Sequence, residues 1–132
     1  MTAGHLIFVY GSLLSGEANH PVMVRCGARL EGAARTAAGF SLYDLGTYPA
    51  LAREGVTEVV GELYVLPDET LPMLDAFEGH PHLYRREEIA LGDGRRAEAY
   101  LWTRDSFLES LATRRRLESG DWRRREEERA AR

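Results

Sequence analysis

Two short stretches carry residues whose types and spacing suit acyl-transfer chemistry. The first is Tyr10-Gly11-Ser12-Leu13, where an apolar run stops at Gly-Ser. A strand that ends there exposes successive backbone N–H groups, which converge on an anion when a tight turn or helix follows. The second is Glu78, an acid in an apolar helical pattern just before Gly79 ends it. Donors for an oxyanion and an acid shielded from water can together catalyse acyl transfer, whereas neither can alone.

Each stretch also has a purely structural interpretation. On spacing alone, Tyr10–Leu13 is a tight turn that caps a core strand, and Glu78 is a solvated residue at the start of a loop. The first stretch matches neither the GxxxxGK[ST] phosphate loop nor the GxSxG nucleophile motif. A helix C-terminus and an apolar wall both raise the pKa of a carboxyl such as Glu78, which suits an acid that takes a proton and returns it.

Other polar residues offer weaker candidates for chemistry. His80 and His82 lie two residues apart, but no third ligand has a diagnostic spacing, so we expect no metal site. Arg85-Arg86 and Arg114–Arg116 could bind a substrate carboxylate, although solvated strand and helix faces explain them more simply. The single Cys26 is interpreted as a buried, small apolar residue rather than a nucleophile.

The elements that must position these residues are read from hydrophobic periodicity and turn signals. We predict a turn at 46–51, a β-bulge or a close backbone approach at Gly61, a hairpin turn at Gly92-Asp93-Gly94 and a surface position for Asp75. Strands are predicted at 5–10, 28–39, 40–45, 58–66, 84–91 and 95–103, and helices at 21–26, 67–77 and 105–117. This order lacks regular βαβ alternation, so it indicates an α+β fold with a mixed sheet or a partly closed barrel.

Bulk properties exclude several classes of protein. The chain has 132 residues, 44% of them hydrophobic, which indicates one globular domain. We place this domain at residues 1–122, followed by a charged tail at 123–132 that we expect to be a solvated or frayed helix. The net charge is −4 and all 17 basic residues are arginine, which disfavours nucleic acid as a partner.

The same properties bear on where the protein works. No apolar run approaches the ~20 residues of a membrane span, and Met1–Gly4 leads directly into a predicted strand, so we expect neither a membrane segment nor a signal peptide. One cysteine cannot form an internal disulfide, and the cytoplasm is the expected location.

The chain resembles the γ-glutamylcyclotransferase-like family, also called AIG2-like, along nearly its whole length. The resemblance rests on a series of motifs in the family's order, at residues 8–13, 48–51, 61–64, 74–79, 84–86 and 120–122. Gly16, Asn19 and His20 fit the continuation seen in the γ-glutamylamine branch. With these motifs in order, the two structural interpretations given above become the weaker ones.

The resemblance implies a small mixed β-barrel flanked by helices, with a cavity at the loop of residues 10–13. It implies that the α-amine of a γ-glutamyl compound attacks its own γ-carbonyl and releases 5-oxoproline and an amine or amino acid, without a metal or organic cofactor. Glu78 is then the expected catalytic proton shuttle. The expected substrate-binding residues are Tyr10, Gly11, Ser12, Leu13 and Tyr84, with the backbone N–H groups of Gly11 to Leu13 stabilising the oxyanion.

One departure from the family's pattern leaves the substrate open. Leu14-Ser15 stands where the γ-glutamylamine branch typically has basic residues, so the identity of the leaving amine is not indicated. Two alternatives remain: a non-catalytic module that binds a γ-glutamyl metabolite, and a cyclotransferase for a γ-glutamylated biosynthetic intermediate. The expected partner is a small-molecule γ-glutamyl substrate, with no nucleic acid and no membrane, and the sequence does not indicate an oligomeric state.

Overall fold

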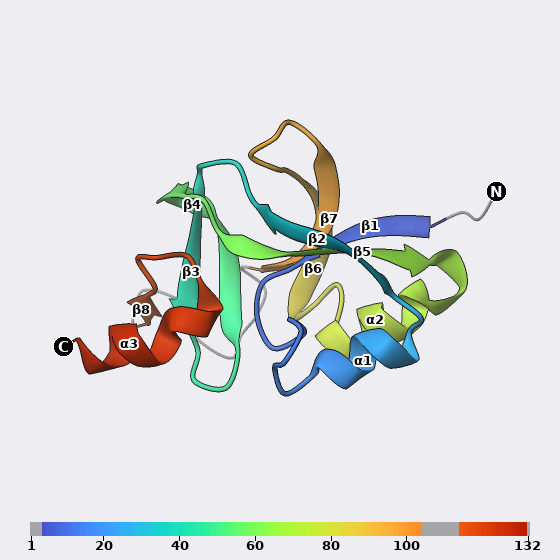
Figure 1. The fold of residues 1–132 in the computed structure, drawn as a ribbon, viewed down its shortest axis with the longest axis horizontal. Coiled ribbons are helices and arrows are strands. Elements are labelled where there is room, and N and C mark those ends of the chain that lie inside the picture. Colours follow the sequence, from blue (N-terminus) through green and yellow to red (C-terminus); the bar gives the residue numbers. More distant parts are fainter. Residues whose placement is uncertain (1–3, 104–113, 132) are drawn as a thin grey trace.

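The computed structural model describes residues 4–103 and 114–131, which form two β-sheets with short helices beside them (Figure 1). In chain order, the strands are β1 (Gly4–Val9), β2 (Arg29–Arg35), β3 (Phe40–Asp44), β4 (Pro49–Thr57), β5 (Val60–Pro67), β6 (Tyr84–Ala90), β7 (Arg96–Trp102) and β8 (Arg115–Arg116). The α-helices are α1 (His20–Arg25), α2 (Leu71–Glu78) and α3 (Arg125–Ala130), and the 3-10 segments are η1 (Asp68–Thr70) and η3 (Trp122–Arg124).

The larger sheet holds most of the core and has the strand order β2-β5-β1-β7-β6. Its central strand β1 runs antiparallel to β5 and parallel to β7. Ile7, Phe8 and Val9 are consecutive and all buried, so both faces of the sheet are covered at β1, which explains why its apolar run is continuous rather than alternating. The sheet is therefore mixed, and the predicted α+β class is confirmed.

The smaller sheet has the order β4-β3-β8 and joins the larger one where β4 lies against β7. In Figure 1 it lies at the left with α3, whereas α1 and α2 lie side by side below β1 and β5. Among the described strands no closed barrel is found. The edge strands β2 and β6 meet only just beyond their ends, at the bridge between Thr36 and Leu91, so the large sheet curls without closing.

The predicted turn at 46–51 is too long, because β4 begins inside it. Leu45 N–H donates to Tyr48 O at 3.1 Å, which closes the turn before Pro49. Proline is accepted at the first residue of a strand, and here it starts one rather than ending a turn. Ala50 and Leu51 then pack in the interior.

Close approach at Gly61 is confirmed. A Cβ there would lie 2.1 Å from Val9 O and 2.6 Å from Phe8 Cζ, so only glycine lets β5 pack against β1 at this point.

The C-terminal part of the chain differs in two ways from expectation. Most of the predicted helix at 105–117 lies outside the described residues, but its end is not helical: Arg115–Arg116 pair with β3 as β8, and Leu117 is buried. The described part of the charged segment is helical as predicted, over η3 and α3. It packs against the smaller sheet through Arg129, which donates to both Asp44 oxygens at 2.6 and 2.8 Å.

None of the helices in the described part of the chain has the length and apolar character needed to cross a membrane.

Candidate active site

A cavity of about 240 Å³ opens where β1 ends, between the larger sheet and the C-terminal end of α2. All six residues expected in the site line it, namely Tyr10, Gly11, Ser12, Leu13, Glu78 and Tyr84. The other lining residues are Phe8, Val9, Asn19, Tyr48, Pro49, Phe77, Leu83 and Tyr100. The two stretches singled out in the sequence therefore meet at one cavity.

The loop after β1 is stabilised by hydrogen bonds within the loop itself, mainly from Asn19 near its C-terminal end. Leu14 N–H donates to Gly11 O at 3.0 Å, which closes a turn. Asn19 then donates twice to Ser12, from its backbone N–H to Ser12 O at 2.8 Å and from Nδ2 to Oγ at 3.0 Å. Within residues 4–103 and 114–131, the N–H groups of Gly11, Ser12 and Leu13 donate no hydrogen bond. They are thus available to a bound molecule.

Gly11 is required for a reason that the sequence did not indicate. It is among the expected substrate-binding residues, but the closest neighbour of this glycine is another part of the chain. A Cβ at Gly11 would lie 2.5 Å from both Cδ and Cγ of Pro49, at the start of β4. The missed strand β4 therefore forms one wall of the site.

Glu78 is the last residue of α2, which ends because Gly79 adopts a left-handed conformation with φ of 69°. Glu78 as a residue is half-buried and lines the cavity, and within the described part of the chain its carboxyl has no hydrogen bond or ion pair. Burial raises its pKa from the ordinary 4.5 to about 7. At neutral pH the carboxyl is therefore able both to accept and to release a proton.

Tyrosine side chains form much of the cavity wall around Glu78. The hydroxyl of Tyr10 donates to Tyr100 O and that of Tyr84 donates to Pro49 O, each at 2.6 Å. Burial raises the pKa of both tyrosines well above the ordinary value, and the nearby Glu78 raises each further. Both hydroxyls stay protonated at neutral pH, so these rings act as walls with fixed dipoles rather than as bases.

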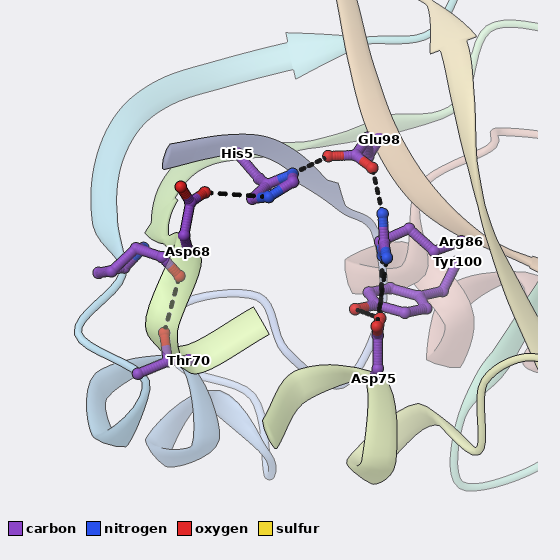
Figure 2. Close-up of polar contacts among 8 residues, drawn as sticks. His5, Asp68, Thr70, Asp75, Arg86, Glu98 and Tyr100 are labelled. Carbon is purple, nitrogen blue, oxygen red and sulfur yellow. Dashed lines mark hydrogen bonds and ion pairs between the residues drawn. The ribbon is translucent and has the colours of Figure 1, made fainter. Parts of the chain in front are cut away.

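Sequence reasoning missed Tyr100 and misassigned Asp75. Tyr100 lies on β7, and its hydroxyl donates to Asp75 Oδ1 at 2.7 Å (Figure 2). Asp75 is not a surface residue but a half-buried partner of Arg86, whose Nε lies 2.9 Å from Oδ1. Two signals were available in the sequence: the alternation of side chains along β7 and the presence of both Asp and Arg residues. Neither shows which residues contact one another.

Comparison with known proteins gives a consistent result. A model of the family described as gamma-glutamyl cyclotransferase, AIG2-like, matches residues 7–124. The chain is 41% identical over 118 residues to a Vibrio cholerae protein provisionally named a gamma-glutamylcyclotransferase, covering 89% of this chain and 95% of that one. It is 36% identical over 91 residues to the gamma-glutamylaminecyclotransferase of Rattus norvegicus, covering 63% and 60%.

A solved structure agrees with these relatives. An AIG2-like protein from Mus musculus superposes with a TM-score of 0.71 at 28% identity, covering 89% of this chain and 88% of that chain. The likeness therefore extends from the sequence to the fold.

Proposed function

The chain belongs to the gamma-glutamyl cyclotransferase, AIG2-like family, and from this premise we propose that it converts a γ-glutamyl amine or γ-glutamyl amino acid into 5-oxoproline. The α-amine nitrogen forms a bond to the γ-carbonyl carbon, and the amide C–N bond then breaks. The proton lost by the attacking amine balances the proton gained by the departing nitrogen. The names of the relatives support gamma-glutamylcyclotransferase activity in general, and the substrate class and residue roles are our inference.

We assign the proton transfer to Glu78. The observation that carries this assignment is the position of a shielded carboxyl, without a partner among the described residues, at the cavity that the Tyr10–Leu13 loop lines. With a pKa of about 7, it takes the proton from the α-ammonium and returns it to the leaving nitrogen without a large free-energy gap in either direction.

We assign charge stabilisation to the loop after β1. The N–H groups of Gly11, Ser12 and Leu13 are the donors for the tetrahedral oxyanion, and each such donor contributes about 3 kcal/mol in comparable sites. Tyr10 and Tyr84 hold the γ-glutamyl arm folded, which favours ring closure because both reacting groups belong to one molecule. The mechanism requires no metal or organic cofactor.

The experiment is a substrate panel with 5-oxoproline as the measured product. γ-Glutamyl amines, γ-glutamyl amino acids and one bulkier γ-glutamylated amine are incubated with the protein, and the product is quantified by mass spectrometry. We expect Glu78→Gln to lower kcat by about 10²-fold to 10⁴-fold, the usual contribution of a general acid–base. Full activity in this variant would refute the role of Glu78.

Control and alternative outcomes follow from the same assay. Glu58→Gln changes an exposed carboxylate outside the cavity and is expected to leave kcat unchanged. Saturable binding of a γ-glutamyl compound without product would favour the binding module, whereas turnover of the bulky amine alone would favour a biosynthetic intermediate as substrate. We propose the cytoplasm as the location, since the single cysteine is free and buried.

A further inference from the structure

Asp75 lies one helical turn before Glu78 on α2, and it fastens this end of the helix to the large sheet (Figure 2). Arg86 of β6 donates to both carboxylate oxygens of Asp75: Nε lies 2.9 Å from Oδ1 and Nη2 lies 3.2 Å from Oδ2. Tyr100 of β7 adds its hydroxyl at 2.7 Å from Oδ1. A two-pronged arginine contact fixes orientation as well as distance, so α2 has little freedom to rotate here.

Arg86 is itself held from its other side. Its Nη1 also donates to Glu98 of β7, which accepts a further contact from His5 Nδ1 of β1 at 2.5 Å. His5 Nε2 in turn lies 3.1 Å from Asp68 Oδ1 in η1. Figure 2 shows these contacts as a row that crosses β1, β7 and β6 and ends on α2. The guanidinium therefore has a fixed place on the sheet.

Asp75 and His80, which lie on either side of Glu78 in the chain, are both hydrogen-bonded to Arg86. His80 N–H donates to Asp75 O at 2.9 Å, and His80 Nδ1 accepts the backbone N–H of Arg86 at 3.0 Å. Glu78 thus lies between two fastened residues.

Tyr100 links this arrangement to the opposite wall of the cavity. While its hydroxyl holds Asp75, its backbone oxygen accepts the hydroxyl of Tyr10 at 2.6 Å. Tyr10 begins the loop that carries the N–H groups of residues 11–13, which donate no hydrogen bond among the described residues. One residue of β7 thus holds both sides of the site at a set separation.

From these contacts we propose that Asp75, Arg86 and Tyr100 form an anchor that positions Glu78 against the Tyr10–Leu13 loop. The three are positioning residues, because Asp75 and Arg86 do not line the cavity and the hydroxyl of Tyr100 is used on Asp75. The role assigned to Glu78 rests on the proposed function, but the geometry that the anchor imposes does not. Burial alone would raise the pKa of Asp75, but the hydrogen bonds from Arg86 and Tyr100 lower it overall, so the anchor stays charged at neutral pH.

The test follows the Glu78 carboxyl directly by carbon NMR as pH is varied, with Glu78→Gln identifying its signal. The titratable groups that line the cavity with this carboxyl are Tyr10 after β1, Tyr48 before β4, Tyr84 of β6 and Tyr100 of β7, and Asp75 lies one turn before it on α2. If the anchor holds Glu78 away from water, Asp75→Asn and Arg86→Gln both lower its pKa toward the ordinary 4.5. Through-space charge alone predicts opposite shifts, because one variant removes an anion and the other a cation.

Arg86→Gln is therefore the decisive variant. A fall in the pKa of Glu78 supports the anchor, whereas a rise or no change overturns it. If this variant does not fold, Tyr100→Phe replaces it, because it removes one anchoring hydrogen bond while keeping the ring and every charge. An unchanged Glu78 pKa in Tyr100→Phe would likewise overturn the proposal.

Turnover provides the second readout. We expect Asp75→Asn and Arg86→Gln to lower kcat about tenfold to a hundredfold with KM changed less than about threefold, since misplacement of a reacting group mainly affects the chemical step. Asp93→Asn is the matched control: it also removes an Asp–Arg pair, the 2.8 Å contact with Arg95 in the exposed β6–β7 turn, and should leave kcat unchanged. The NMR titration needs no substrate, so an inactive substrate panel would count against the function and not against the anchor.

Discussion

Two carboxylates on one helix show how the environment gives residues of the same chemistry different roles. Asp75 and Glu78 are a single turn apart on α2, yet the pKa of Asp75 is lowered and that of Glu78 is raised. The difference lies in the partners, because Asp75 has Arg86 and Tyr100 whereas Glu78 has the apolar and tyrosine walls of the cavity. Divergent pKa values in neighbouring acids are a common mark of an acid–base site.

The raised pKa of Glu78 also predicts a cost in folding stability. Between pH 4.5 and about 7 the folded protein binds a proton that the unfolded chain has released, so stability falls as pH rises through this window. Glu78→Gln removes the cost. We expect the variant to be more stable than the parent by on the order of 1–3 kcal/mol at pH 8, and little changed at pH 4, because each pKa unit is worth about 1.4 kcal/mol and partial exposure reduces the total.

Urea unfolding followed by tryptophan fluorescence at the two pH values measures this difference. Glu58→Gln, at an exposed position, should show no gain at either pH. An equal effect of Glu78→Gln at pH 4 and pH 8 would contradict a carboxyl that titrates within the window. A gain in stability together with a loss of turnover is the usual trade-off at a functional residue.

At the scale of elements, the site depends on how closely β4 approaches the end of β1. Pro49 opens β4, and its ring fills the space next to Gly11 that a side chain would need. Its carbonyl also accepts the Tyr84 hydroxyl, so the same residue fixes part of the tyrosine wall. A substitution at this junction therefore affects both the Tyr10–Leu13 loop and the tyrosine side chains of the cavity wall.

We predict that Gly11→Ala both destabilises the fold and impairs the site. The new methyl group meets the Pro49 ring at 2.5 Å, and relieving the overlap requires a shift of either the loop or β4. Overpacking of this kind typically costs about 1–3 kcal/mol. Gly92→Ala is the comparison, because a Cβ there meets its nearest neighbour, Thr36 O, at an ordinary 3.5 Å. Melting temperature and kcat/KM should fall for Gly11→Ala and hold for Gly92→Ala; equal behaviour would show that the contact is easily relieved.

At the scale of the whole molecule, the C-terminal segment contacts and stabilises the loop after β1. Arg123 of η3 donates to Ser15 O at 2.7 Å and lies 3.3 Å from Glu62 Oε2. Glu62 is buried on β5 and also accepts the N–H of Ser15 at 2.8 Å. Arg125 reaches the same loop through Glu17 at 2.9 Å. Residues near the two ends of the chain are therefore joined around one buried carboxylate.

We expect Arg123→Gln to lower stability at pH 7 by about 1 kcal/mol, because Glu62 loses its cation but keeps its hydrogen bonds from Ser15 and Tyr64. Burial alone would raise the pKa of Glu62, but these contacts lower it overall, so their stabilisation is present at neutral pH and is lost as pH falls through the folded pKa. Arg124→Gln breaks only an exposed pair with Glu127 and should change stability by less than about 0.5 kcal/mol. Urea unfolding that fails to separate these two variants would count against the link.

Local pattern in the sequence determined a large part of this protein. The apolar run of β1 ends at Gly11, α2 ends at Gly79, and the hairpin turns near Gly92-Asp93-Gly94, each because short-range chemistry specifies it. Motifs in family order also selected six of the residues that line the cavity. The pattern failed at β4, where Pro49 is an ambiguous signal, since proline suits both a turn and the start of a strand.

Only the tertiary structure decided which residues meet. Strand order brings the loop at 10–13 opposite Glu78, gives Asp75 its partners on β6 and β7, and sets Pro49 against Gly11. These contacts join segments far apart in the chain, and they depend on which surfaces the sheet buries together. A short window of sequence contains no information on that choice, because the free energy that selects it belongs to the whole packed core.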